Sequence, residues 1–305
     1  MESCDLTGNV VGKPSRFSGM VLAQETSMMW LLSTILGMAV LLGCSGESSS
    51  VKNEEPREAR VGAAALEFSP PSPETIPGTR LGEQIRLGYK IVVNTQEYAK
   101  AYVGNSLNCT NCHLDAGLNP NAAPFVGLAS VYPEYRARNA RVNTLADRVN
   151  ECFERSLNGQ ALPPDSSKLQ AVVAYITWLS HGVPQGATLP WRGLQRIGSQ
   201  RSPDPGNGKT LFANKCAFCH GSDGQGTMAA PPVWGPQSYN IAAGMARVTV
   251  AAAFIKSNMP RGWGWSLSDD DAYDVAAYIN SQPRPDFPGK ANDWPKGGKP
   301  ADSPY

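Results

Sequence analysis

The sequence predicts an all-α protein made of two similar halves. Both halves contain the pattern Cys-x-x-Cys-His, and the two terminal histidines, His113 and His220, lie 107 residues apart. Both halves also contain Ala-Tyr-Ile, which begins at Ala174 and at Ala277, 103 residues apart. The chain has 30 Gly and 25 Pro among 305 residues, so we expect short helices separated by many loops.

The chain begins with a predicted export signal. The apolar run Trp30–Gly43 is too short to span a bilayer and has the length of a signal-peptide core. We interpret residues 1–43 as a signal peptide, in which the stretch before about Gly12, with Cys4, is an extension or a start-site artefact. The run ends in Leu-Leu-Gly-Cys, which looks like a bacterial lipobox and would place a lipid on Cys44. We therefore expect a periplasmic protein with a candidate lipid anchor.

Composition divides the remaining chain into five segments. Ser, Glu and Pro dominate the stretch after Cys44, and four prolines mark a linker in the middle of the chain. The last 23 residues contain six prolines and no periodic pattern, so we expect them to be extended or to wrap the surface. The segments are a disordered tether (44–78), a first domain (79–181), a linker (182–205), a second domain (206–282) and a Pro-rich tail (283–305).

Helical patterns recur in both domains. Each Cys-x-x-Cys-His pattern follows a predicted helix, over residues 81–93 in the first domain and 208–214 in the second. Each domain closes with a helix that begins at N-cap residues, Asp165-Ser166-Ser167 and Ser268-Asp269-Asp270. A further helix is predicted over residues 143–157, because its apolar side chains recur at helical spacing.

The Cys-x-x-Cys-His patterns predict two covalently bound c-type haems, one in each domain. The four attachment cysteines are Cys109, Cys112, Cys216 and Cys219. Zinc would need two more ligands at each site, and a redox dithiol would need a βαβ pattern around it; neither is evident in the sequence. Bacterial c-type haem is attached outside the cytoplasm, which agrees with the export signal.

The order of helix, haem motif and closing helix resembles class I cytochrome c. The second half is especially similar, with Gly208, Leu211 and Phe212 before the motif and Asn258-Met259-Pro260 after it. The resemblance implies two class I cytochrome c-like domains, each with one covalent haem, joined by a linker. His113 and His220 are then the proximal iron ligands.

The residue opposite each iron decides what the haem can do. Met259 lies 39 residues after His220, and Cys152 lies 39 residues after His113. A cysteine therefore occupies the first-domain position that corresponds to the methionine of the second. The alternatives are His181 for the first haem and Met228 or Met245 for the second.

Cys152 lies on the predicted helix 143–157 among cationic residues. Helical spacing places Arg148, Arg155 and Ser156 on its face. Nearby guanidinium groups favour the thiolate, which is the form that ligates metals and attacks sulfur. We therefore expect an iron ligand or a nucleophile; the alternative is a buried structural thiol.

The segment RVNECFERSLNGQ, in a chain with two haem motifs, resembles the thiosulfate dehydrogenase family. The resemblance implies that His113 and Cys152 ligate a catalytic haem, and that His220 and Met259 ligate an electron-transfer haem. It also implies a thiosulfate pocket around Cys152 formed by Arg138, Arg148, Ser156 and Gln160. Some relatives use a lysine as an alternative ligand to the second haem. Lys256 is close to Met259, but Asn258 occupies the adjacent position.

The activity that this resemblance implies is oxidation of two thiosulfates to tetrathionate, with electrons passing through the second haem to an acceptor such as a small cytochrome. The reaction can also run in reverse, as tetrathionate reduction. The alternatives are a dihaem electron carrier without its own substrate and a carrier subunit similar to those of the Sox system. Lys and Arg total 27 against 26 Asp and Glu, so no basic surface indicates a nucleic acid partner.

Overall fold

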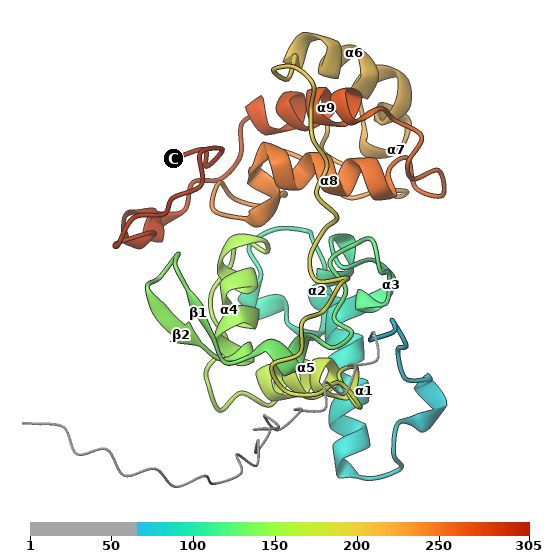
Figure 1. The fold of residues 1–305 in the computed structure, drawn as a ribbon, viewed down its shortest axis with the longest axis vertical. Helices are drawn as coiled ribbons and strands as arrows, with labels where there is room; N and C mark the ends of the chain where they lie inside the picture. The colour runs from blue at the N-terminus through green and yellow to red at the C-terminus, as the bar shows by residue number, and fades with distance from the viewer. Residues whose placement is uncertain (1–65) are drawn as a thin grey trace, which may run out of the picture. The chain divides into compact units, whose positions relative to one another are not determined.

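The computed structural model describes residues 66–305 (Figure 1). The predicted signal peptide, Cys4, Cys44 and most of the predicted tether lie outside the described residues. Within residues 66–305, no helix is both long and apolar enough to cross a membrane.

Helices dominate both halves of the described chain. The first half contains α1 (Arg80–Val93), α2 (Thr95–Tyr98), α3 (Leu114–Gly117), β1 (Glu134–Arg136), β2 (Arg141–Asn143), α4 (Leu145–Arg155) and α5 (Ser167–Trp178). The second half contains α6 (Pro205–Lys215), α7 (Ala217–His220), α8 (Val248–Asn258) and α9 (Asp269–Ser281). The fold class is therefore the mostly helical one that the sequence predicts.

The first and last helices of each half cross at a glycine. In the first half α1 packs on α5, and a Cβ on Gly88 would lie 2.0 Å from the carbonyl oxygen of Ala171. In the second half α6 packs on α9, and a Cβ on Gly208 would lie 2.0 Å from the carbonyl oxygen of Asp274. Only glycine permits so close an approach between helix backbones. The internal repeat of the sequence is thus a repeat of one helix crossing.

The predicted helices are confirmed with small shifts at their ends. The helix expected over residues 143–157 is α4, which begins later because Thr144 caps it: the Thr144 hydroxyl accepts from the Asp147 N–H at 3.1 Å. Ser166 and Ser268 are the N-caps of α5 and α9, as predicted, and each side chain accepts a backbone N–H of the first turn.

A two-stranded hairpin was not predicted. β1 and β2 pair antiparallel, with Glu134 opposite Asn143 and Arg136 opposite Arg141. The hairpin leads directly into α4, because Asn143 is the last strand residue and its buried amide donates to Glu151 on that helix at 2.9 Å. The hairpin therefore fixes arginines of the 134–141 segment beside the helix that carries Cys152.

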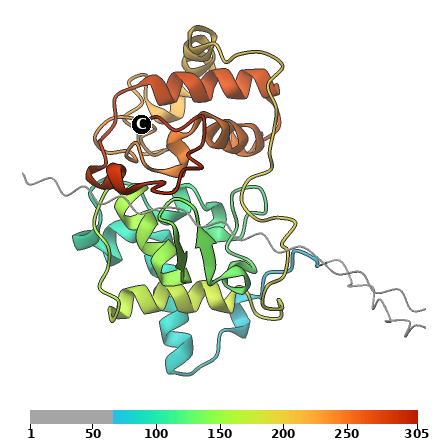
Figure 2. The same cartoon turned by 60° about the vertical axis from the view of Figure 1, so that its left-hand side comes forward.

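The Pro-rich tail packs back onto the first half, as one of the two predicted alternatives. After a short 3₁₀ turn (Pro288–Asn292), the backbone N–H of Trp294 donates to the carbonyl of Arg138 at 2.6 Å. Figure 2 shows this tail, in dark red, beside α4 and the hairpin. Asn105 adds a buried link between the halves, since its amide donates to the carbonyls of Ser156 and Ser238.

Candidate haem sites and a cationic cavity

An apolar cavity in the first half brings together the predicted haem residues. It is lined by Cys109, Cys112, His113 and Cys152, with Val92, Phe125 and other apolar side chains. The Nδ1 of His113 lies 2.7 Å from the carbonyl oxygen of Ala123, which leaves Nε2 as the available metal ligand. Burial lowers the pKa of His113 to about 4, so the imidazole stays in the neutral form that binds iron. These residues fit a covalent haem.

A second cavity, of about 310 Å³, has the same construction in the second half. Cys216, Cys219, His220 and Met259 line it. The Nδ1 of His220 lies 2.8 Å from the carbonyl oxygen of Pro231, and burial lowers the pKa of this histidine. These residues also fit a covalent haem.

The alternative axial ligands differ in their placement. His181 is exposed at the end of the closing helix and does not line the first cavity. Met228 is fully exposed and lies outside the second cavity. Met245, in contrast, lines the second cavity together with Met259. Both methionines are therefore placed near the second haem.

The two apolar cavities share part of their walls. Leu107 and Cys112 line both of them. Cys112 is one of the two predicted attachment cysteines of the first motif, so a group bound to it would lie at the boundary with the second cavity. This arrangement brings the two haem sites next to each other.

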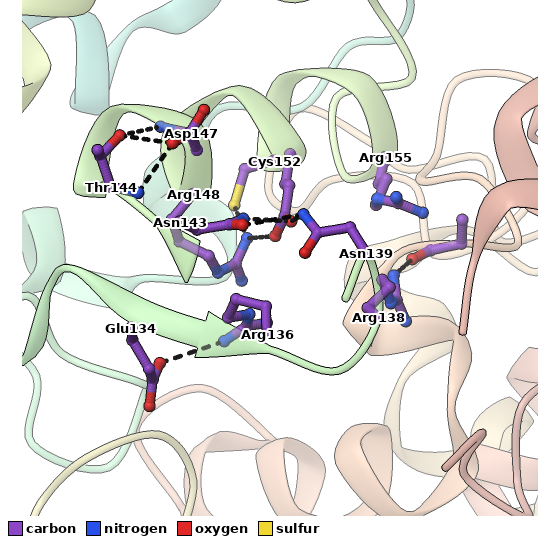
Figure 3. A network of polar contacts seen from close by, with 12 residues as sticks. Glu134, Arg136, Arg138, Asn139, Asn143, Thr144, Asp147, Arg148, Cys152 and Arg155 are labelled. Carbon is purple, nitrogen blue, oxygen red and sulfur yellow. Dashed lines mark hydrogen bonds and ion pairs between the residues drawn. The ribbon is translucent and has the colours of Figure 1, made fainter. Parts of the chain in front are cut away.

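Cys152 lies under an arginine of its own helix. Arg148 Nη1 donates to Cys152 Sγ at 3.0 Å, across one turn of α4. The charge interaction with Cys152 raises the pKa of Arg148. Arg148 also lies 3.6 Å from the buried carboxylate of Glu151, which accepts hydrogen bonds from Asn139 and Asn143 (Figure 3). This network holds the guanidinium beside the sulfur.

A polar cavity of about 370 Å³ adjoins the first haem cavity. Arg148 and Ser156 line both cavities, so the two meet beside Cys152. Figure 3 shows Arg136 on β1 near Arg148, Arg138 on the loop that follows β1, and Arg155 at the end of α4. The arginines that line the polar cavity are Arg136, Arg138, Arg148, Arg155 and Arg247. The cavity is therefore suited to anions.

The predicted pocket residues are only partly brought together. Arg138, Arg148 and Ser156 line the polar cavity. Burial and the charge of Arg155 lower the pKa of Arg138, as expected for neighbouring cations. Gln160 lies elsewhere: its exposed side chain donates to the carbonyl of Ala101 at 3.0 Å, and it lines neither the polar nor the first haem cavity.

Sequence reasoning missed Arg136, Glu151 and Arg247. Arg136 lies two residues before Arg138, a spacing that would have been informative only if the strand had been predicted. Arg247 comes from the start of α8, almost 100 residues after Cys152, and no local pattern connects the two. Only the fold brings this side chain to the cavity.

Comparison with known proteins identifies the family. A profile described as "SoxA/TsdA, cytochrome c domain" matches residues 95–185, and one described as "Cytochrome c" matches residues 206–283. Thiosulfate dehydrogenase of Stutzerimonas stutzeri is 44% identical over 268 residues, which is 85% of this chain and 87% of that protein. The chain belongs to the thiosulfate dehydrogenase family. This confirms the family resemblance that was inferred from the sequence. Membership of the family indicates an oxidoreductase with two covalently bound c-type haems.

Two further relatives of the family agree. Thiosulfate dehydrogenase of Allochromatium vinosum is 44% identical over 71% of this chain and 84% of that protein. The solved structure of thiosulfate dehydrogenase (TsdBA) from Marichromatium purpuratum superposes with a TM-score of 0.68 at 40% identity. It covers 73% of this chain, which in turn spans half of that longer chain.

Proposed function

We propose that this protein oxidises two thiosulfates to one tetrathionate at Cys152, and delivers the electrons through its second domain to an external acceptor. The observation that carries the proposal is the junction of two cavities at Cys152. Arg148 and Ser156 line both the first haem cavity and the polar cavity, and Arg148 contacts the Cys152 sulfur. An anion in the polar cavity would therefore lie beside both the thiol and the haem.

We assign His113 and Cys152 as the residues that would hold the iron of the first haem, and His220 and Met259 as those that would hold the iron of the second. The bound haems would supply one-electron acceptors, and Met259 would give the second haem a higher potential than Cys152 gives the first. The shared wall of Leu107 and Cys112 supports direct passage of electrons between them.

The arginines offset the repulsion between substrates. Two unit charges about 4 Å apart repel by roughly 4 kcal/mol at an effective dielectric constant of 20, and two dianions contain four such pairs. Arg138 and Arg148 would bind the sulfonate oxygens, since a guanidinium matches an oxyanion with two parallel donors. Ser156 would donate a neutral hydrogen bond. Gln160 is assigned to the pocket by the family resemblance alone, and its amide would have to leave Ala101 to reach the cavity.

Cys152 would carry the first substrate. In the first half-reaction a bond would form between Sγ of the Cys152 thiolate and the outer sulfur of thiosulfate, and the two electrons released would need the one-electron acceptors that bound haems supply. In the second, another thiosulfate attacks that outer sulfur, the bond to Sγ breaks, and tetrathionate leaves. The thiolate is restored, and no proton is needed in either step. The same steps in reverse reduce tetrathionate.

We further propose export to the periplasm, with a lipid on Cys44 after removal of residues 1–43. The support is the signal-like run before Cys44 and the extracytoplasmic attachment of bacterial c-type haem. Intact mass measurement of the mature N-terminus tests this proposal. We expect the lipidated mass to disappear in Cys44→Ala, and an unmodified, uncleaved N-terminus would refute both steps.

The decisive experiment compares the purified haem-loaded protein with Cys152→Gly. We expect thiosulfate to reduce the wild type, with ferricyanide as the final acceptor, and the variant to be inactive. A low-spin thiolate–haem spectrum should disappear in the same variant. If both proteins are inert to thiosulfate and spectrally alike, Cys152 is a structural thiol and the chain is a dihaem electron carrier.

A further inference from the structure

The polar cavity beside Cys152 is lined in part by the C-terminal tail. Trp294, Gly298 and Pro300 of the tail line it on the side where Arg138 lies over the Trp294 ring and Arg247 pairs with Asp302, which we call its tail end. These three tail residues lie beyond both matched regions, 95–185 and 206–283. The tail end of the cavity is thus built partly by a segment outside the two matched cytochrome domains.

Two aspartates of the tail hold arginines of the cavity in place. Asp293, whose side chain is 3% exposed, accepts two hydrogen bonds from Arg155 at 2.7 and 2.9 Å. The same carboxylate lies 3.9 Å from Arg138 Nε and accepts from the Tyr305 hydroxyl. Asp302 accepts from Arg247 Nε at 2.7 Å. The tail therefore fixes the three guanidinium groups from one side.

The arginines keep donors for another ligand. Arg138 donates Nη1 to the carbonyl of Ala242 and lies over the Trp294 ring at 4.8 Å, which leaves Nη2 without a hydrogen bond to the described residues. Arg247 donates Nε to Asp302 and Nη2 to Thr249, which leaves its Nη1 without a hydrogen bond to the described residues. The buried Nε of Arg155 also has no partner within residues 66–305. An oxyanion is the natural acceptor for such donors.

The cavity has room for two anions. Two thiosulfates contain ten non-hydrogen atoms, which at roughly 30 Å³ for each water-sized group need about 300 Å³. The cavity offers about 370 Å³. One anion beside Arg148 and Cys152 would therefore leave space for a second at the tail end.

We propose that the tail end of the cavity is the binding subsite of the second sulfur oxyanion, with Arg138 and Arg247 as its cationic ligands and Asp293 as the positioning residue that orients Arg138 and Arg155. This inference rests on the proposed function and adds the place from which the attacking thiosulfate comes. Its outer sulfur forms the new bond to the sulfur held on Cys152, and the bond to Sγ breaks. No electron leaves in this step, so the subsite acts after the haems have been reduced.

The test separates the two half-reactions in the haem-loaded protein. We expect Arg247→Gln and Asp293→Asn to raise the apparent KM for thiosulfate by about tenfold, because each change removes or misplaces a charge-assisted hydrogen bond. The kcat should stay within about twofold. In a single turnover with one thiosulfate per protein, both variants should give the wild-type amplitude of haem reduction, because that step needs only the first anion. Tyr305→Phe, which removes a single bond to Asp293, should produce a smaller KM increase.

Two matched variants control for charge and for tail packing. Arg141→Gln removes an arginine of the hairpin that is 61% exposed and does not line the cavity. Asp286→Asn removes an exposed tail carboxylate that pairs with Lys290. Both controls should keep the wild-type KM. A wild-type KM in Arg247→Gln and Asp293→Asn would overturn the subsite, as would an equal loss of the single-turnover amplitude in both. Wild-type protein that thiosulfate does not reduce would instead overturn the proposed function itself.

Discussion

Replacement of Arg148 by alanine should weaken thiosulfate binding more strongly than any other single change in the cavity. Arg148 Nη1 lies 3.0 Å from Cys152 Sγ. At that distance a guanidinium attracts one unit of negative charge by about 5 kcal/mol at an effective dielectric constant of 20. The side chain is 33% exposed, so water screens part of this, and about 2 to 3 kcal/mol is a realistic net loss. That loss corresponds to a roughly 30- to 150-fold lower kcat/KM, mainly through KM.

Glu151, which pairs with Arg148, should also affect the loss of activity. Without Arg148, the buried Glu151 loses its ion pair and leaves an uncompensated negative charge at the cavity wall. Arg148→Ala with Glu151→Gln should therefore recover about five- to tenfold of the lost kcat/KM. The assay is initial-rate ferricyanide reduction over a range of thiosulfate concentrations, with Arg141→Ala as the exposed control. Unchanged kinetics in Arg148→Ala would remove this arginine from the pocket, and no recovery in the double variant would refute the electrostatic account.

Three further predictions concern the second domain. Met259→Ala should lower the midpoint potential of the second haem and Met245→Ala should not, because methionine ligation raises the potential; redox titration distinguishes them. Burial of Asp274 favours its neutral form, but hydrogen bonds from Arg201 and other donors outweigh this and lower its pKa. Stability should therefore be complete above its usual pKa of 3.8 and fall as the pH drops through the lowered value, in denaturation curves measured from pH 5 downward. Gly208→Ala should cost about 2 to 3 kcal/mol of unfolding free energy, because the new Cβ would meet the Asp274 carbonyl, whereas Gly198→Ala, with open space around it, should be neutral in the same assay.

The repeat in the sequence predicted the helical fold well, because local signals specify its parts. N-cap residues such as Ser166 and Ser268 act within one turn, and the haem motifs place their histidines by short-range spacing. Equal spacing from His113 and His220 also found Cys152 and Met259, which line the first and second haem cavities. These inferences needed only the number of residues between positions within one domain.

The cavity wall could not be predicted, because its parts come from distant segments. Arg247 and Trp294 reach the polar cavity only through the packing of α8 and the tail against the first half. The tail has no apolar period, so nothing in it indicated that Asp293 would be almost fully buried against Arg155. The hairpin strands have three residues each, too few for the alternation that identifies a strand. Gln160 shows the opposite case. Its position eight residues after Cys152 matches the family pattern, but its side chain does not line the polar cavity.

The contacts of Asn258 and Lys256 bear on whether the second haem could exchange its proposed ligand, Met259, for a lysine. Its buried amide donates to the carbonyl of Asn121 at 2.9 Å and to that of Phe254 at 3.1 Å. Lys256 is also engaged, since its Nζ donates to the carbonyl of Leu267 at 2.6 Å and pairs with Asp269 at 3.0 Å. Lys256 is therefore held by other partners, and Asn258 fills the position next to the proposed ligand Met259 with a buried amide.

We accordingly expect the second haem to keep one ligand set in both oxidation states, so that its reductive and oxidative titrations coincide. Asn258→Lys should make the two titrations diverge, because the new amine reaches the position beside Met259 and the link to Asn121 is lost. Lys256→Ala serves as the control and should leave them coincident. If the wild-type titrations already diverge, and Lys256→Ala restores their agreement, then Lys256 leaves its partners during reduction and the static contacts of α8 do not describe the ligand exchange.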